Sequence, residues 1–288
     1  MKRKILKSIK QLFTPNTLVI VKSIHDFTQY PHCHYLGGLK KADKICKYMD
    51  MATAELALQN ATLQFSEPTC WPDQYEGRFY LANYSKLKVD KFITPAVLAC
   101  CFTTNPINEA QIRTYCHHNE TGKASKCVMF EIQRTALRSC IDNWLKNHSQ
   151  YECYEGMANY SLSNSELNKL HISGQRYHRE VFAGFDLSHY LSLLLLKRKA
   201  FSYEGELRFM LVAKDHSIRK GSLERMLMAV NWPDVIRNIY VDDDCDDEMF
   251  DAFTQRCAKY GISSERISRF NLYEMERTIT IQPPKSKR

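Results

Sequence analysis

The sequence predicts a single-domain α+β protein with a mixed β-sheet. Apolar runs of strand length and stretches of helical periodicity are intermixed along the chain, without the strict strand–helix–strand alternation of a parallel α/β sheet. The 288 residues are 44% hydrophobic and 25% charged, which is ordinary for a globular protein and sufficient for a sizeable core. Neither an internal repeat nor a long linker is present. We therefore expect one domain over residues 43–275, a basic N-terminal extension with one strand over 1–42 and a polar basic tail over 276–288.

Apolar patterns of period two, or continuous apolar runs rich in β-branched and aromatic residues, predict the strands. The expected strands are Thr17–Lys22, Ile45–Met49, Thr62–Ser66, Val97–Thr103, Cys127–Ile132, Phe201–Val212, Val235–Val241 and Arg266–Tyr273, with a further strand or hairpin in Tyr151–Tyr160. The expected helices are Thr53–Gln59, Ile107–His118, Arg134–Asn147, Ser165–Leu170, Ser188–Lys197 and Asp246–Tyr260, the last capped by Gly261. Residues 23–44 and the proline-containing residues 67–95 are expected to form loops and turns.

The eleven cysteines form no Cys-x-x-Cys pair, and their odd number indicates free thiols in a reducing compartment rather than a disulfide framework. His32-Cys33-His34 has no second Cys/His pair at a zinc-finger spacing, so no metal site is expected. Lys7 and Lys10 interrupt the start of the chain before an apolar signal region can form, and the leucine-rich Leu191–Leu196 is far too short to cross a membrane. We expect a cytoplasmic protein with no membrane partner.

The net charge of +8 predicts affinity for a polyanion such as nucleic acid. The basic residues are dense only at the two ends, in Lys2–Lys4 and Lys285–Arg288, where a solvated tail is the alternative explanation. The acidic stretch Asp242–Glu248 lacks the glycine and the final glutamate of a calcium loop, and we expect it to supply the N-terminal charges of the helix that follows.

The segment Phe201–Val212 carries the sharpest chemical pattern of the sequence. As one strand it would alternate apolar and polar residues and set Glu204, Glu206 and Arg208 side by side on one face. Repulsion between the two carboxylates would raise the pKa of one of them unless a cation neutralises the pair, and Arg208 is placed to do so. One carboxylate of such a pair can stabilise a developing sugar cation while the other deprotonates an acceptor. The alternative is an exposed strand face with a Glu–Arg salt bridge.

Several short segments match, in order and spacing, the pattern of a bacterial family. The matching pieces are Lys47-Tyr48, Leu63–Glu76, Cys101–Thr103, Tyr115 and Tyr203–Arg208. Their order resembles the family catalogued as domain of unknown function 2971, over about residues 43–275. The sequence departs from the family pattern at Pro72, Gln74, Thr103 and Ile112.

A more distant resemblance links the same succession of elements to ADP-ribosyltransferases, which carry an Arg or His, a Ser and a Glu on it. The resemblance implies an ADP-ribosyltransferase-like split β-sheet core with flanking helices, and NAD as the substrate. It implies that Glu206 and Glu204 are catalytic and that Ser66 supports the nicotinamide ribose. The remaining expected site residues are Lys47, Tyr48, Tyr203 and Arg208 as NAD-binding residues, and Asp73, Tyr75 and Glu76 as a substrate loop. The first strand carries Lys47 in place of the usual Arg or His.

Each of these residues also has a structural explanation. The Lys47-Tyr48 pair fits a strand with one exposed lysine and one packed phenol, and Ser66 fits the start of a turn at Pro68. Asp73 and Glu76 fit turn and cap positions.

The sequence therefore favours an NAD-dependent ADP-ribosyltransferase, acting as a toxin or antiviral-defence effector on RNA, DNA or protein and restrained by an antitoxin or inhibitor protein. Two alternatives stay open. One is an NAD glycohydrolase, in which water is the acceptor; the other is a non-catalytic nucleic-acid- or protein-binding module whose Glu-x-Glu pair is structural. A cleft lined by Glu206, Ser66 and either Lys47 or Tyr48 would favour the enzyme.

Overall fold

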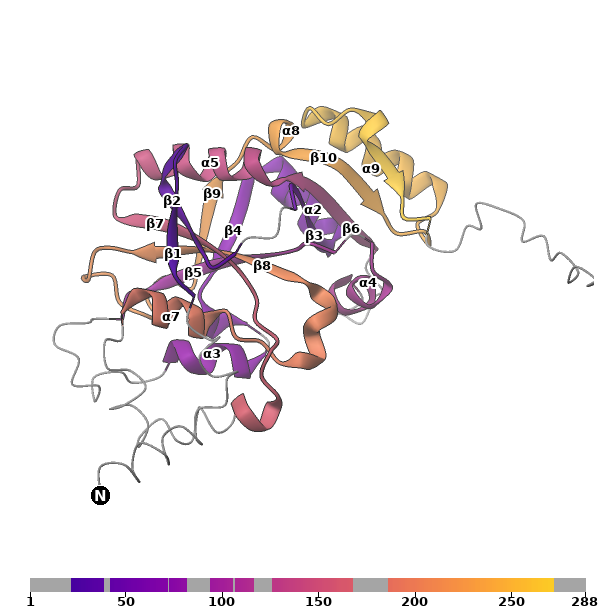
Figure 1. The fold of residues 1–288 in the computed structure, drawn as a ribbon. Helices are drawn as coiled ribbons and strands as arrows, with labels where there is room; N and C mark the ends of the chain where they lie inside the picture. Colours follow the sequence, from indigo (N-terminus) through magenta and orange to yellow (C-terminus); the bar gives the residue numbers. More distant parts are fainter. Residues whose placement is uncertain are drawn as a thin grey trace, which may run out of the picture.

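The computed structural model describes residues 22–38, 42–71, 73–81, 94–105, 107–116, 126–167 and 186–271, which form one large β-sheet with helices packed against it (Figure 1). The strands are β1 Ile24–Phe27, β2 Tyr30–Leu36, β3 Lys44–Asp50, β4 Thr62–Ser66, β5 Val97–Thr103, β6 Cys127–Gln133, β7 Tyr151–Met157, β8 Glu206–Ala213, β9 Arg225–Ala229, β10 Ile236–Val241 and β11 Ile267–Arg269. The helices are α2 Met51–Gln59, α3 Gln74–Leu81, α4 Glu109–Cys116, α5 Arg134–Lys146, α7 Leu187–Leu194, α8 Trp232–Val235 and α9 Asp247–Lys259, with 3-10 helices η1 Pro68–Cys70, η3 Lys199–Glu204 and η4 Ser264–Arg266.

The sheet runs in the order β1-β2-β7-β8-β5-β3-β6-β10-β11, and it forks at β5. One edge of β5 pairs with β8 over its whole length, from Val97 to Thr103. The other edge is shared, because β4 pairs with β5 at Ala99 whereas β3 pairs with it at Thr103. Parallel pairs occur between β2 and β7 and between β10 and β11, while β8 is antiparallel to both its neighbours. The predicted α+β class with a split sheet is confirmed.

Strand β8 lies in the interior of the sheet, between β7 and β5, and all eight of its residues are buried. Because side chains alternate along a strand, Leu207, Phe209 and Leu211 enter the larger core, which includes residues of α2 and α5. Met210 and Val212 point to the opposite core with α7 and with Tyr80 of α3. Figure 1 shows α5 on one side of the sheet and α7 and α3 on the other. The face of β8 that carries Glu206 and Arg208 is therefore the face covered by α7 and α3.

Hydrophobic periodicity and capping place most of the helices where they were predicted. Asp246 caps the N-terminus of α9 by accepting a hydrogen bond of 2.8 Å from the Met249 amide, and Asp50 caps α2 by accepting one of 2.9 Å from the Thr53 amide. Gly261 follows α9 in a left-handed conformation, with φ +81°, as expected of a glycine at this position. The acidic stretch before α9 thus serves the helix terminus, as predicted.

Three predictions of secondary structure are wrong. Residues 23–44, expected to be a loop, contain the strands β1 and β2, because β2 completes the sheet beside β7 and buries Cys33 and Leu36. The turn-rich residues 67–95 contain helix α3, whose Glu76 and Tyr80 are buried. The strand predicted over Phe201–Val212 begins only at Glu206, because η3 occupies its first half.

Parts of some predicted elements lie outside the described residues. They include the strand Thr17–Lys22 up to residue 21, the end of the helix Ser165–Leu170 and the polar tail at 276–288. Of the segment predicted as an N-terminal extension, residues 24–36 form two strands of the common sheet. None of the helices in the described part combines the length and apolar character needed to span a bilayer.

Candidate active site

The Glu-x-Glu pair lies at a break between two kinds of backbone. Glu204 is the last residue of η3, Gly205 takes a left-handed conformation with φ +51°, and Glu206 is the first residue of β8. A Cβ atom on Gly205 would lie 2.8 Å from Oδ1 and Nδ2 of Asn105, which donates a hydrogen bond of 2.5 Å to the Tyr203 carbonyl. Any other residue at this position would have to displace the Asn105 side chain and adopt a strained backbone. The prediction that strand alternation sets the carboxylates side by side is therefore wrong, and a helix-to-strand turn brings them together instead.

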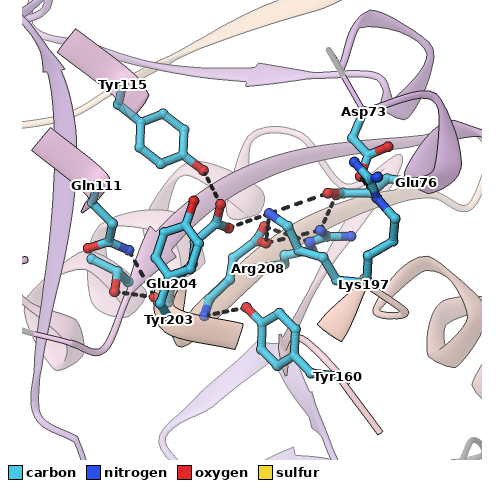
Figure 2. Close-up of polar contacts among 12 residues, drawn as sticks. Asp73, Glu76, Gln111, Tyr115, Tyr160, Lys197, Tyr203, Glu204 and Arg208 are labelled. Atoms are coloured by element: carbon cyan, nitrogen blue, oxygen red, sulfur yellow. Dashed lines mark hydrogen bonds and ion pairs between the residues drawn. The ribbon is translucent and has the colours of Figure 1, made fainter. Parts of the chain in front are cut away.

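Five charged side chains form a buried charge cluster beneath this turn (Figure 2). It consists of Glu76 from α3, Lys197 after α7, Glu204, Glu206 and Arg208. Each of these residues is at most 7% exposed. Charged groups are almost never buried to this extent unless they are paired.

Lys197 joins all three carboxylates. Its Nζ lies 2.7 Å from Oε2 of Glu206 and 3.3 Å from Oε1 of Glu76, and it also binds Glu204. Arg208 lies deeper and is fully buried; its Nε is 2.7 Å from Oε1 of Glu206, and its Nη2 binds Glu76. The predicted contact between Arg208 and the pair is thus confined to Glu206, and Lys197 neutralises Glu204.

The cluster contains three carboxylates and two cations, and the two glutamates of the motif respond differently. Burial raises the pKa of the Glu206 carboxyl, but Arg208 and Lys197 outweigh burial and hold that pKa below its ordinary value. Burial also raises the pKa of the Glu204 carboxyl. The attraction of Lys197 lowers this pKa but does not cancel the effect of burial, so the pKa stays above its ordinary value. Glu206 is therefore held ionised, while Glu204 takes up a proton more readily than an exposed glutamate does.

A cavity of about 150 Å³ opens on the same two glutamates. It is enclosed by β3, β5, α4 and the turn before β8. Its lining residues are Cys46, Lys47, Tyr48, Cys101, Phe102, Thr103, Gln111, Tyr115, Glu204 and Glu206. The cavity lies at the fork of the sheet, where β3 meets β5 only through Cys46 and Thr103.

Helix α4 contributes Gln111 and Tyr115, which share one face because they are four residues apart. The Tyr115 hydroxyl donates a hydrogen bond of 3.0 Å to Oε1 of Glu204. The Gln111 amide nitrogen donates one of 3.1 Å to the Glu204 backbone carbonyl. Figure 2 shows both side chains turned toward Glu204. Helix α4 therefore fixes the position of this glutamate.

Lys47 and Tyr48 line the cavity from β3, as the sequence predicted for at least one of them. The Lys47 ammonium lies 3.2 Å from the Cys101 carbonyl oxygen, 3.4 Å from the Cys100 sulfur and 5.1 Å from the centre of the Phe102 ring. Within the described residues it forms no ion pair with a carboxylate. Burial and the Glu206 carboxylate raise the pKa of the Cys101 thiol, so Cys101 is a poor candidate for a nucleophile.

Other predicted site residues lie elsewhere. Ser66 is not among the residues that line the cavity; it pairs with Ala99, four residues before the cavity-lining Thr103 on β5. In the expected substrate loop only Glu76 joins the charge cluster, whereas Asp73 forms an ion pair of 3.0 Å with Arg198.

Tyr75 stacks against two guanidinium groups, those of Arg78 and Arg198, at 4.5 Å and 4.9 Å from its ring centre. Tyr203 contributes its backbone carbonyl to the turn and is not among the cavity-lining residues.

Three residues of the site, Lys197, Gln111 and Tyr115, were not among the predicted site residues, although Tyr115 belongs to the segments that match the family pattern. Lys197 follows a leucine-rich helix and resembles an ordinary basic residue at a helix end. The helical spacing of Gln111 and Tyr115 was visible, but the residue they face, Glu204, is about ninety positions further along the chain. Among the described residues, no group of three or more His, Cys, Asp or Glu side chains is arranged to hold a metal ion.

The sequence has no match among the family models or the curated proteins, and a weak structural likeness to two solved structures. No family model matches the sequence, so the resemblance to domain of unknown function 2971 stays a prediction, and no curated protein matches it. Two solved structures have some likeness, both of DarT from Thermus sp. 2.9. The complex with NAD+ has a TM-score of 0.34 and 9% identity over 81% of this chain and 97% of the other. The complex with ADP-ribosylated ssDNA has a TM-score of 0.33 and 8% identity over 80% and 94%.

Proposed function

We propose that this protein transfers ADP-ribose from NAD to an acceptor, and that the cavity binds the nicotinamide–ribose end of NAD. The observation that carries the proposal is the pair of buried glutamates on the cavity wall, backed by a cluster with more carboxylates than cations. The nicotinamide ring of NAD is a cation, and in the transition state its charge moves to the ribose. A wall with excess negative charge in a buried site stabilises both forms.

The two glutamates suit two different roles in this reaction. The bond between ribose C1′ and the ring nitrogen breaks, and its electron pair leaves with neutral nicotinamide. Glu206, held ionised by Arg208 and Lys197, stabilises the positive charge that develops on the ribose. As the acceptor atom, an oxygen or nitrogen that carries a hydrogen, bonds to C1′, its proton passes to Glu204, whose raised pKa suits a general base.

The size of the cavity fits one end of a dinucleotide. Sites that enclose a whole ligand usually have volumes of about 300–1,000 Å³, and this cavity has about 150 Å³. The adenosine end would then lie outside. Lys47, whose ammonium has no carboxylate partner in the described residues, is placed on the lining to bind the pyrophosphate.

The acceptor in this proposal is nucleic acid, RNA or DNA, because of the net charge of +8; a protein acceptor is the alternative. The proposal includes the biological role that the sequence resemblance implies, a cytoplasmic toxin or antiviral-defence effector that an inhibitor protein restrains.

The decisive experiment incubates the protein with NAD labelled in its adenosine part, with single-stranded nucleic acid, with cell protein, or with neither. Released nicotinamide and label on each acceptor are measured. We expect label on nucleic acid, and a loss of activity of about a hundredfold or more in Glu206→Gln. Glu152→Gln is the matched control, because Glu152 is a partly exposed carboxylate of β7 outside the cluster.

The outcomes separate the functions considered. Nicotinamide release without labelling of any acceptor would identify a glycohydrolase. No consumption of NAD, together with no heat of NAD binding in calorimetry, would overturn the enzymatic proposal and leave a binding module. A fully active, well-folded Glu206→Gln protein would remove Glu206 from the mechanism.

A further inference from the structure

A second, much smaller hollow borders the charge cluster. Two members of the cluster, Glu76 and Lys197, line it, whereas the cavity is lined by two others, Glu204 and Glu206 (Figure 2). The hollow and the cavity therefore open on different members of one cluster. With about 10 Å³, the hollow has room for about one water-sized group, such as one oxygen of a phosphate.

The charge of the hollow is opposite to that of the cavity. Among its lining residues are three cations, Arg78, Lys197 and Arg198, and one carboxylate, that of Glu76. This carboxylate is already bound to Lys197 and to Arg208. The cavity, in contrast, has two glutamates and one lysine on its lining. An anion is therefore attracted to the hollow, as a cation is attracted to the cavity.

The two arginines of the hollow are held by one ring and keep free hydrogen-bond donors. The guanidinium groups of Arg78 and Arg198 lie 4.5 Å and 4.9 Å from the centre of the Tyr75 ring. Among the described residues, the Arg78 side chain has no ion pair or hydrogen bond, and Arg198 uses only its Nε, which binds Asp73 at 3.0 Å. Arg78 is partly exposed, and the Arg198 side chain is 28% exposed. Both guanidinium groups are thus accessible to a ligand.

Stacking on a ring prepares an arginine to bind phosphate. The planar guanidinium presents its N–H groups as a rigid fork that matches phosphate oxygens, and a stacked guanidinium loses little freedom when it binds. Two like charges beside one ring, with a single carboxylate partner between them, also gain from a bound anion. The geometry and the charge of this arginine pair therefore both favour a phosphate ligand.

The chain connects the arginine pair directly to the charge cluster. Arg198 follows Lys197, and Arg78 lies two residues after Glu76 on α3. The helix η3 then leads from Lys199 to Glu204 on the cavity wall. A phosphate bound by the pair would therefore lie beside the cluster that backs the cavity.

We propose that Arg78 and Arg198 bind a backbone phosphate of the acceptor, a single-stranded nucleic acid, whose target base reaches Glu204 in the cavity. This inference rests on the proposed function, in which the acceptor is nucleic acid. The strand is single because a base in a duplex is stacked and paired and does not enter a cavity unless it is flipped out. The inference also gives the predicted substrate loop a role, since Asp73 and Tyr75 hold the two arginines.

The test replaces each arginine by glutamine, which removes the charge and keeps a polar side chain. Affinity for a labelled single-stranded oligonucleotide is measured by fluorescence anisotropy at several salt concentrations, and NAD affinity by calorimetry. We expect Arg78→Gln and Arg198→Gln each to bind the oligonucleotide about tenfold more weakly, the effect of one charged hydrogen bond. The slope of log affinity against log salt should fall by about 0.7 for each lost phosphate contact. NAD affinity should stay unchanged.

Arg237→Gln is the matched control, because it loses the same charge at an exposed position of β10 outside the hollow and the cavity. Its ion pair with Asp43 is 3.9 Å long and exposed, so its loss should cost little stability. We expect this control to bind the oligonucleotide nearly as well as the wild type. Thermal melts show which variants are folded. Should Arg198→Gln unfold through the loss of its Asp73 partner, Arg78→Gln, which breaks no ion pair among the described residues, still decides.

The outcomes separate this inference from the proposed function. Weaker oligonucleotide binding in the two arginine variants, with NAD affinity unchanged, supports the phosphate site, even if the wild type consumes no NAD and the proposed function fails. Weaker NAD binding alone would assign the pair to the pyrophosphate of NAD and overturn the inference. An equal loss in Arg237→Gln would show an effect of net charge only and overturn it too. So would a wild type that labels cell protein and binds no oligonucleotide, in which case the transferase activity stands.

Discussion

Glu206 is held between Lys197 and Arg208, and this contact makes part of the stability of the protein depend on pH. Its folded-state pKa lies below the ordinary value of 4.5, because the two cations outweigh the effect of burial. A carboxyl group with a lowered pKa stabilises the fold above the unfolded-state pKa, and the contribution is lost as the pH falls below it. Glutamine at this position does not titrate.

We therefore expect the difference in the free energy of unfolding between the wild type and Glu206→Gln to be constant above about pH 6 and to shrink below about pH 4.5. Urea denaturation of both proteins between about pH 7 and pH 3 measures it. A difference that does not change across this range would mean that folding does not lower the pKa of Glu206. Because Glu206 is buried and paired with two cations, we expect Glu206→Gln to lose stability as well as activity.

Lys220 is a second titrating residue, remote from the cavity. Burial lowers the pKa of its ammonium to about 8, and its Nζ lies 4.9 Å and 4.6 Å from the ring centres of Tyr80 and Tyr190. A lysine whose folded-state pKa is lowered destabilises the fold below that pKa, and the penalty is relieved as the pH rises toward the unfolded value of 10.5. We expect Lys220→Met to gain most relative to the wild type below about pH 8, with the gain shrinking between about pH 8 and 10.5. Thermal melts across this range test it, and a gain independent of pH would contradict it.

At the scale of single residues, the sequence predicted those site residues that belong to short motifs, the Glu-x-Glu pair and the Lys-Tyr pair. Glu204, Glu206, Lys47 and Tyr48 do meet at one cavity. Lys197 could not be found, because a lone lysine near a leucine-rich helix has no local feature that separates it from a solvated one.

Gly205, with its left-handed backbone conformation, forms the turn that joins η3 to β8. Alanine there would have to displace Asn105, whose amide is bound to the Tyr203 carbonyl, in addition to adopting a left-handed backbone. Gly221 is the matched control, since it has φ +78° but no atom lies within 4 Å of the position that a Cβ would take. We expect Gly221→Ala to cost about 1 kcal/mol, from backbone strain alone. Gly205→Ala should cost about 1–3 kcal/mol more and should abolish NAD binding.

Denaturant unfolding of the two glycine variants gives the comparison, and calorimetric titration with NAD shows whether the turn is needed for the site. Equal losses of stability would mean that the contact with Asn105 relaxes freely. A Gly205→Ala protein that binds NAD normally would show that the position of Glu204 does not depend on this turn.

At the scale of elements, hydrophobic periodicity predicted the strands and helices whose local sequence has a clear apolar pattern. Strands β3, β4, β5 and β6 and helices α5 and α9 carry clear apolar patterns, and they lie where they were expected. Strands β1 and β2 were missed because their histidines and tyrosines resemble a loop until β7 is beside them. Helix η3 was missed because the alternation of its residues is the same as that of a strand.

The molecule as a whole carries a charge of +8, and residues 1–21 contain five basic residues and no acidic one. We expect binding to single-stranded nucleic acid to weaken steeply with salt. Replacing Lys2, Arg3 and Lys4 by serine should lower the slope of log affinity against log salt by about 2 and leave NAD affinity unchanged. Fluorescence anisotropy with a labelled oligonucleotide at several salt concentrations measures the slope. Absence of binding at low salt would favour a protein acceptor.

The charge cluster has a consequence for the time at which activity can begin during synthesis. In chain order its members are Glu76, Lys197, Glu204, Glu206 and Arg208. A nascent chain that stops before Lys197 therefore contains Glu76 without either of the two cations that pair with it. Translation must pass Arg208 and expose it beyond the ribosome before the cavity wall exists. A cell that makes this protein therefore receives the proposed activity only from chains whose domain is nearly finished, and fragments released early are inactive.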